Sequence, residues 1–283
     1  MVAQLGAEEK EIAARSSYQY SKLSDAITNR GERMDRIRDR AAMGMAVRHW
    51  IAEKGDTAKA LKQLRKTIQY RADKQAVEIR KCFDEDTPQA IELRSKVAHY
   101  LGQEGRMFVR GYDLEGRACF HFICRNSPAY SKTDPDGCIE AHFYVLEKAL
   151  ACTERRTFGK VGTVIVSVDF NNFIKRHAPP MNMIKEMLAM LKDHYPERLH
   201  RVYLVDAPVV FRALWSLIKP FVDPVTKTKF QFVTGEKQRM QVFGETMEAG
   251  ECMSYQRSDG IMVEQIDMDK FYGLAYEMAY DEL

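Results

Sequence analysis

Asp169 has the type and position of a residue that could do chemistry. It follows the apolar run VIVSV at 164–168, and enzymes built on α/β sheets often place a catalytic carboxylate where a buried strand ends. A carboxylate at this position can instead accept hydrogen bonds from the turn that follows, and we favour that interpretation. The segment DPDG at 134–137 has the composition of a calcium loop. It lacks the ordered oxygen ligands and the closing Glu of such a loop, so we expect a turn there.

Common catalytic and metal-binding motifs are absent from the sequence. It contains no G-x-G-x-x-G, G-x-x-x-x-G-K-[ST] or G-x-S-x-G, which argues against nucleotide and acyl-transfer chemistry. The six cysteines form no C-x-x-C pair and the seven histidines form no H-x₃-H set, so we expect reduced thiols, no metal and no cofactor. The aromatic residues in FHF at 120–122 have no basic residues flanking them on the same strand faces. This favours a core strand over a nucleic-acid platform.

The charge of the chain is unevenly distributed. The net charge is +3 over 283 residues. Residues 1–83 hold 18 Lys+Arg against 11 Asp+Glu, or +7, which leaves 25 against 29, or −4, for the remainder. A basic N-terminal part could favour an anionic membrane surface or nucleic acid, or it could consist of solvated helix faces. The longest aliphatic run is far too short to span a membrane and no leader is recognisable, so we expect a cytoplasmic protein.

Residues 1–85 are predicted to form a helical lobe. The stretch before the acidic break DEDTP at 84–88 has no proline and only four glycines. One helix is predicted over 41–53, where KGD stops it. A second is predicted over 57–82, with Asp56 or Thr57 as its N-cap. Its apolar face consists of Leu61, Leu64, Ile68 and Ala72.

Beyond the break, strands alternate with helices. The pattern predicts two strands around the turn DLEG in RMFVRGYDLEGRACFHFIC, helices over 139–155 and 181–194, and strands in GTVIVSVDF, VYLVDAP and KFQFV. GTVIVSVDF is apolar on both faces, as parallel strands covered by helices are. The alternation predicts an α/β sheet wound with crossover connections.

The segment between the last two strands is unusually apolar for a surface helix. At 100° per residue its apolar side chains cover an arc of roughly 160°, wider than the ~100° stripe of an ordinary surface helix. It runs directly into Lys227 and Lys229. One interpretation is a buried helix followed by a buried strand. The other is a helix that covers a cavity for a ligand both apolar and anionic.

At HYPERLHRVYLVDAPVVFRALWSLIKPFVDPVTKTKF, residues 194–230, the chain resembles the CRAL-TRIO lipid-binding family, and within it the phosphatidylinositol-transfer branch. The shared run is Y-P-E-R, a strand, [ND]-A-P, an apolar helix and K-P-F-[LV]-D-P-x-T. The resemblance extends over residues 86–235 in element order and in DLEGR, and RHWIAEKGDTAKALKQLRKTIQYR resembles the family's helical lobe. It fades after about residue 240, where ECMSYQRSDG does not match the family's ending.

The resemblance implies a fold. A helical N-terminal lobe over 1–85 is followed by a domain over 86–283 with a C-terminal extension. This domain has a mixed, mostly parallel sheet whose helices enclose a hydrophobic lipid pocket. A helix at about 209–221 gates the pocket, with Phe211, Leu214, Trp215, Ile218, Phe221 and Val222 as its gating residues.

The resemblance also implies headgroup contacts at Glu197, Thr226 and Lys229. A lysine supplies a cation for the phosphate, a threonine can donate or accept, and a glutamate accepts from inositol hydroxyls. The strand expected to begin at Thr226 would meet the headgroup. Thr226 and Lys229 are three apart and would point to opposite faces of a regular strand, so at least one must lie in the turn after Pro224. The alternative for Glu197 is a surface pair with Arg198 or a neighbouring lysine.

The sequence departs from the family pattern in two places. The headgroup arginine of the family's helical lobe aligns with Glu53, so that contact is lost or is replaced by Lys54. Polar positions that bind choline lipids in relatives are occupied by Val109, Val164 and Val166. We therefore expect weak binding of choline lipids and a pocket for a second, hydrophobic ligand.

The resulting hypothesis is a monomeric carrier that is not an enzyme and does not bind nucleic acid. It would hold phosphatidylinositol, exchange it peripherally at membranes and present it to lipid kinases. Two alternatives stay open: a carrier of an apolar small molecule such as a sterol or tocopherol, and a signalling scaffold with a vestigial pocket.

Overall fold

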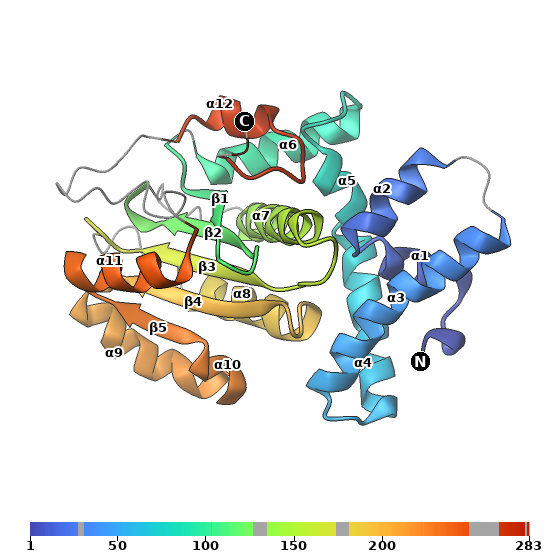
Figure 1. Cartoon of the computed structure of the whole chain (residues 1–283), viewed down its shortest axis with the longest axis horizontal. Coiled ribbons are helices and arrows are strands. Elements are labelled where there is room, and N and C mark those ends of the chain that lie inside the picture. The colour runs from blue at the N-terminus through green and yellow to red at the C-terminus, as the bar shows by residue number, and fades with distance from the viewer. Residues whose placement is uncertain are drawn as a thin grey trace.

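A five-stranded sheet surrounded by helices forms the centre of the computed structural model (Figure 1). The strands follow one another in chain order, with β1 and β2 antiparallel and β2 to β5 parallel. The predicted mixed, mostly parallel sheet is confirmed. The strands are β1 (Met107–Tyr112), β2 (Ala118–Ile123), β3 (Val164–Asp169), β4 (Leu199–Val205) and β5 (Phe230–Val233). The structure describes residues 1–27, 31–102, 104–126, 135–173, 181–222, 224–248, 266–280 and 282.

Helices form the N-terminal part and the crossovers of the sheet. The N-terminal helices are α1 (Ala7–Ala14), α2 (Tyr18–Ala26), α3 (Glu32–Ala52), α4 (Thr57–Asp73) and α5 (Ala76–Lys81). The later ones are α6 (Pro88–Leu101), α7 (Pro135–Arg156), α8 (Met181–His194), α9 (Val209–Ile218), α10 (Pro224–Thr228), α11 (Gly235–Thr246) and α12 (Met268–Gly273). Three-residue 3-10 turns are η1 (Val2–Gln4), η2 (Cys124–Asn126) and η4 (Lys219–Phe221). Within the described ranges, no helix is both long and apolar enough to cross a membrane.

Two local predictions are wrong. The helix predicted over 57–82 is interrupted, because Gln75 between α4 and α5 has a left-handed backbone with φ 49°. DPDG does not form a turn over its described part, since residues 135–137 begin α7. Proline is favoured in the first turn of a helix, where its missing N–H has no intrahelical partner to lose. Asp134 and the segment ECMSYQRSDG lie outside the described residues.

The N-terminal helices have a small core of their own. α3 begins earlier than predicted, at Glu32, and α4 begins where predicted. The carboxylate of Asp56 caps α4 by accepting a 3.0 Å hydrogen bond from the N–H of Lys59. Leu64 and Ile68 of α4 pack in one buried cluster with residues of α3 and of the first turns. The predicted apolar face is thereby confirmed at Leu61, Leu64 and Ile68, whereas the prediction is wrong for Ala72, which is exposed.

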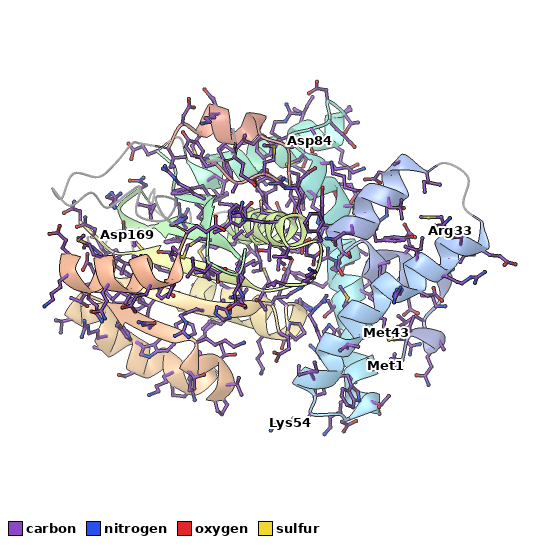
Figure 2. All side chains as sticks on the ribbon, in the orientation of Figure 1. Met1, Arg33, Met43, Lys54, Asp84 and Asp169 are labelled. Carbon is purple, nitrogen blue, oxygen red and sulfur yellow. The ribbon has the colours of Figure 1, made fainter. Side chains whose placement is uncertain are left out.

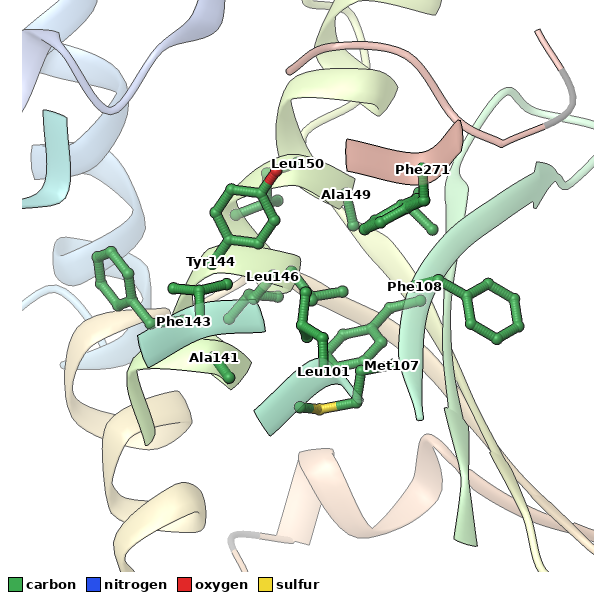
Figure 3. Close-up of a cluster of buried hydrophobic side chains, with 14 of the residues drawn as sticks. Leu101, Met107, Phe108, Ala141, Phe143, Tyr144, Leu146, Ala149, Leu150 and Phe271 are labelled. Carbon is green, nitrogen blue, oxygen red and sulfur yellow. The ribbon is translucent and has the colours of Figure 1, made fainter. Parts of the chain in front are cut away.

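The main core lies between α7 and its neighbours. Leu146 and Ala149 of α7 lie among Leu101 of α6, Met107 of β1 and Phe271 of α12 (Figure 3). On the opposite face of the sheet, side chains of β3, β4 and β5 form a second buried cluster with α11. The predicted α/β architecture, with helices on both faces, is therefore confirmed.

A buried ion cluster on α7 joins the N-terminal helices to the sheet. The carboxylate of Glu147, 1% exposed, accepts hydrogen bonds of 2.7 and 3.0 Å from Arg71 of α4 and of 2.6 Å from Nε of Arg80 of α5. It also accepts a 2.6 Å bond from the hydroxyl of Tyr195. Burial alone would raise the pKa of Glu147, but Arg71 and Arg80 outweigh it and hold that pKa well below its usual range. The carboxylate is therefore charged at neutral pH.

The C-terminal segment closes the edge of the sheet at β1. The ammonium of Lys148, on α7, donates to the carbonyls of Ala275 and Tyr276 at 3.0 and 3.2 Å. The N–H of Tyr280 donates to the carbonyl of Val109 at 2.9 Å. The bond from Tyr280 satisfies part of an edge strand whose backbone would otherwise be open to another chain. The described part of the C-terminal extension thus belongs to the fold of the sheet.

Replacing Glu147 by Gln should destabilise the protein by about 3–5 kcal/mol, because it leaves two buried arginines without their counter-charge. The pKa of Glu147 is lower in the folded than in the unfolded chain, so its contribution is present above pH about 4.3 and is lost as pH falls further. Urea unfolding at pH 7 and pH 3.5 measures both effects, with Glu140→Gln on the same helix as a charge-matched control. This account would be contradicted if the difference in free energy of unfolding between wild type and Glu147→Gln were as large at pH 3.5 as at pH 7.

Candidate functional site

The turn YPER at 195–198 is held at both ends by carboxylates of α7. Tyr195 binds Glu147, as described above. The guanidinium of Arg198 donates a 2.9 Å hydrogen bond to the carboxylate of Glu154 and a 2.8 Å bond to the carbonyl of Gly162. The connection between α8 and β4 is therefore fixed relative to the helix that carries the main core.

Glu197 projects from this fixed turn into solvent. Its side chain is exposed, and its backbone is left-handed with φ 57°, a conformation that costs a non-glycine residue roughly 1–2 kcal/mol. The alternative pair with Arg198 does not form, because Arg198 is buried and bound to Glu154. Among the residues that the structure describes, no lysine pairs with Glu197 either. The turn presents an acceptor at a strained backbone position, as functional residues often are.

Lys229 lies beside the start of the strand that follows this turn. Its ammonium donates a 2.7 Å hydrogen bond to the carbonyl of Leu199, the first residue of β4. The carbonyl of Lys229 accepts a 2.9 Å bond from the N–H of Val202, also on β4. The ammonium of Lys229 therefore lies beside Leu199, which follows Glu197 by two residues in the chain.

Thr226 lies one turn before Lys229, on α10. The N–H of Lys229 donates to the carbonyl of Thr226 at 3.0 Å. The prediction that a strand begins at Thr226 is wrong, because Pro224 starts a short helix and β5 begins only at Phe230. The expectation that Thr226 and Lys229 cannot both lie on a regular strand is confirmed, since neither does. The three predicted headgroup residues thus precede β4 or β5 in the chain.

One face of the sheet carries two apolar rows that cross all five strands. Residues in register on neighbouring strands point to the same face, so each row is a continuous surface. The first row is Met107, Phe122, Val168, Leu204 and Phe232, and the second is Val109, Phe120, Val166, Val202 and Phe230.

This apolar face is covered incompletely in its middle. On β3, the central strand, the side chains on the α11 side are buried, whereas Val166 and Val168 stay partly exposed. Phe122, Phe230 and Phe232 on the neighbouring strands are partly exposed as well. A central parallel strand normally packs helices on both faces, as the sequence predicted for GTVIVSVDF. The structure instead leaves apolar surface at the centre of the sheet.

The three valines predicted to line a second-ligand pocket differ in burial. Val109 and Val164 have no exposed surface and belong to the main core beneath α7. Val166 is partly exposed and contacts both the main core and the aromatic cluster beneath α9. Of the three, Val166 lies on the incompletely covered surface.

Helix α9 and the 3-10 turn η4 occupy the segment predicted to gate the pocket. Phe211 packs on Phe170 with ring centroids 4.4 Å apart, and Trp215 packs on Phe230 at the same separation. Arg212 lies over the ring of Phe232 at 5.3 Å. The helix is therefore attached to β5 and to the end of β3 mainly through aromatic contacts.

Prolines lie at the limits of this segment. α9 begins directly after Pro208, Pro220 lies in η4, and Pro224 begins α10. Val222 is buried. The side chains of the other predicted gating residues, Leu214, Ile218 and Phe221, lie outside the described residues.

Glu53 and Lys54, expected near a lost headgroup contact, lie at the end of α3. Glu53 is the C-cap, and its N–H donates to the carbonyl of His49 at 3.0 Å. Lys54 is exposed in the turn to α4 (Figure 2). The structure supplies no described contact from either residue to Glu197 or Lys229.

Asp169 has the structural role predicted for it. Its carboxylate accepts a 2.8 Å hydrogen bond from the N–H of Asn171 and a 3.0 Å bond from Arg125. Burial raises the pKa of Asp169. The carboxylate braces the turn after β3.

The sequence interpretation missed most of the apolar face. Phe122, Phe170, Phe230 and Phe232 are predicted from the sequence only as members of strands. Aromatic residues at every second position in FHF and KFQFV were the available signal. Which face they occupy depends on the strand register, which the sequence does not give.

The fold and this site define a class of protein. A family model described as the CRAL/TRIO domain matches residues 102–248, just over half of the chain. The chain therefore belongs to the CRAL/TRIO domain family, whose members bind and transfer lipids.

Individual relatives agree with this assignment. A CRAL-TRIO domain-containing protein of Schizosaccharomyces pombe is 30% identical over 128 residues, 45% of this chain and 12% of that protein. The phosphatidylinositol transfer protein PDR17 of Saccharomyces cerevisiae is 26% identical over 191 residues, 66% of this chain and 51% of that protein. The chain thus spans about half or less of the length of these relatives. The crystal structure of Sfh5 has the same fold, with a TM-score of 0.52 and 16% identity over 74% of this chain and 70% of that one.

Replacing Glu197 by Gly should not lower the free energy of unfolding, and should raise it by up to about 1 kcal/mol, because glycine adopts a left-handed backbone without steric cost. Urea unfolding measures the change. The matched control is Glu186→Gly in α8, an exposed helical position where glycine should cost about 1 kcal/mol. A loss of stability in Glu197→Gly similar to that of the control would show that Glu197 has a structural rather than a functional role.

Proposed function

We propose that the chain binds phosphatidylinositol, exchanges it at membranes and presents it to lipid kinases. In this proposal the helical lobe at 1–85 supports a lipid-binding domain at 86–283. The lipid tails lie on the incompletely covered apolar face of the sheet, beneath α9. The headgroup lies near Glu197, Thr226 and Lys229. The carrier works as a monomer in the cytoplasm and touches membranes only transiently.

The observation that carries the proposal is the apolar surface on the central strands. Val166 and Val168 stay partly exposed although their neighbours on the same strand are buried. Apolar surface in the middle of a sheet is stabilised when an apolar ligand replaces water on it, by about 25 cal/mol for each Å² covered. Acyl chains have the length and the apolar character to cover two rows of side chains.

The chemistry of the proposed headgroup site supports an anionic polyol. Lys229 offers a cation for a phosphate, and Glu197 offers an exposed acceptor for hydroxyl groups. A choline headgroup would not use this combination. The partly exposed position that would face a second ligand, Val166, offers no hydrogen bond to a phosphocholine group.

Two further functions would give different results in the same assays. A carrier of a sterol or tocopherol would bind its ligand on the apolar face but would not depend on Lys229. A scaffold with a vestigial pocket would transfer no lipid at all. Phosphatidylinositol transfer that depends on the headgroup residues therefore separates the three.

Replacing Lys229 by Ala should lower the affinity for phosphatidylinositol about 10- to 150-fold, because it removes a charge-assisted contact worth roughly 1.5–3 kcal/mol. Transfer between vesicles, measured for phosphatidylinositol and phosphatidylcholine side by side, reads out the effect. Lys227→Ala is the control, since it removes the same charge from α10 nearby. Equal transfer of phosphatidylinositol by the folded Lys229→Ala and Lys227→Ala proteins would overturn the headgroup assignment.

Helix α9 is the proposed gate. A diacyl lipid has on the order of 30 methylenes at ~0.8 kcal/mol each, so its transfer from membrane to water would cost roughly 24 kcal/mol. The carrier must cover the tails in solution and uncover them at the bilayer. The contacts that attach α9 to the sheet are mostly aromatic and apolar, so a bilayer could replace them.

A cross-link that holds α9 closed should abolish transfer. Arg212 of α9 donates a 2.9 Å hydrogen bond to Thr234 beyond β5, and both side chains are exposed. Arg212→Cys and Thr234→Cys can therefore be joined by a short bis-maleimide that contains a cleavable disulfide. Reduction should restore transfer, and Arg212→Cys alone with the same reagent is the control. Full transfer by the verified cross-linked protein would show that α9 is not the gate.

A further inference from the structure

The outer face of α3 is apolar over its C-terminal half. Met43, Val47, Trp50 and Ile51 are each between 44% and 49% exposed. The opposite face of the helix is buried in the N-terminal core, where Ala42, Met45 and Ala46 are at most 4% exposed. The exposed residues recur at helical spacing, so they form one strip rather than scattered contacts. The described part of the chain leaves about half of each of these side chains exposed.

The same face of α3 is basic over its N-terminal half. At 100° per residue, Arg33, Arg36 and Arg40 fall with the apolar strip within an arc of roughly 100°. Arg33 and Arg40 are exposed, and no acidic side chain in the described ranges pairs with either. Arg36 and Glu32 approach to 3.7 Å, but both are more than 80% exposed, so this pair contributes little. Figure 2 shows Arg33 at one end of α3 and Met43 near its middle.

The arginines are gathered around a hollow in the surface. Arg33, Arg36 and Arg40, with Ile37, line an open depression of about 430 Å³. Three arginines that border one depression suit anionic groups, because a guanidinium can donate two parallel hydrogen bonds to a phosphate or carboxylate. The depression lies on the helical lobe and shares no lining residue with the site at Glu197, Thr226 and Lys229.

We propose that this face of α3 docks the helical lobe on an anionic membrane surface. The apolar strip would enter the headgroup region, with Trp50 at the interface that tryptophan prefers, and the arginines would bind anionic headgroups. Charge complementarity favours an anionic membrane as the partner of this face. The residues up to 83 carry a surplus of +7, from 18 Lys+Arg against 11 Asp+Glu. The proposal goes beyond the lipid carried by the sheet, because it requires no ligand there.

The two tryptophans allow a direct test, since Trp50 lies on α3 and Trp215 on α9. In the Trp215→Phe protein, Trp50 is the sole tryptophan. Vesicles of phosphatidylcholine with 30% phosphatidylserine and brominated acyl chains should shift the emission of Trp50 to the blue and quench it. The protein should bind these vesicles about tenfold more strongly than vesicles of phosphatidylcholine alone. If Trp215→Phe lowers the Tm, the wild type is compared with Trp50→Phe instead. The quenching seen in the wild type should then be lost in Trp50→Phe.

Two variants separate the parts of the surface. Arg33→Gln, Arg36→Gln and Arg40→Gln together should weaken binding to the anionic vesicles about tenfold or more, since each basic residue near the surface contributes. Lys160→Gln, Lys192→Gln and Lys237→Gln remove the same charge from exposed positions elsewhere and should have a smaller effect. Val47→Ser with Ile51→Ser should abolish the blue shift of Trp50.

Several outcomes would overturn the proposal. One is that Trp50 is not quenched in vesicle-bound protein. Another is that the two charge variants bind the anionic vesicles equally well. A third is that sedimentation shows self-association that shields Trp50. Failure of the proposed function can be distinguished from failure of this proposal. A protein that docks through α3 but moves no phosphatidylinositol would contradict the carrier assignment and leave this surface intact.

Discussion

The buried carboxylate of Glu147 is the interaction on which the remaining structure depends. It receives Arg71 from α4, Arg80 from α5 and Tyr195 from the turn before β4. One α7 side chain therefore joins α4 and α5 to the turn that presents Glu197. Such a cluster adds little net stability compared with apolar packing, yet it tolerates few alternative arrangements. Its physical contribution is to fix the positions of α4, α5, α7 and the YPER turn relative to one another.

The sheet extends this geometry into an apolar surface. Two apolar rows cross all five strands. Their side chains are buried on β1 and β4 and partly exposed on β3 and β5. Toward β5 the cover is α9, which rests on aromatic rings and is bounded by prolines. A surface held rigidly from one side and covered from the other by a replaceable helix suits a ligand that must enter and leave. The YPER turn precedes β4, and the ammonium of Lys229 binds the carbonyl of Leu199 at the start of β4. This end of the surface is therefore polar.

The fold was largely predictable from the sequence, and the site only in part. The alternation of patterns placed every strand and the helices α7, α8 and α9, because apolar periodicity dominates local structure. The break at Gln75 could not be predicted, since a left-handed residue there depends on how α5 packs on α7. Pro224 offered a signal for α10 that the strand pattern of KFQFV obscured. The two apolar rows required the strand register, and the exposure of α3 required knowing what packs on its other face.

The most direct test of the account is to identify the lipid that the protein holds. Native mass spectrometry of the purified full chain, followed by analysis of the released lipid, would do so without any assumption about the site. The account predicts phosphatidylinositol at one molecule per chain, and less of it in Lys229→Ala than in wild type. A protein that retains only a sterol-like molecule or phosphatidylcholine, or that carries no lipid after exposure to phosphatidylinositol vesicles, would contradict it.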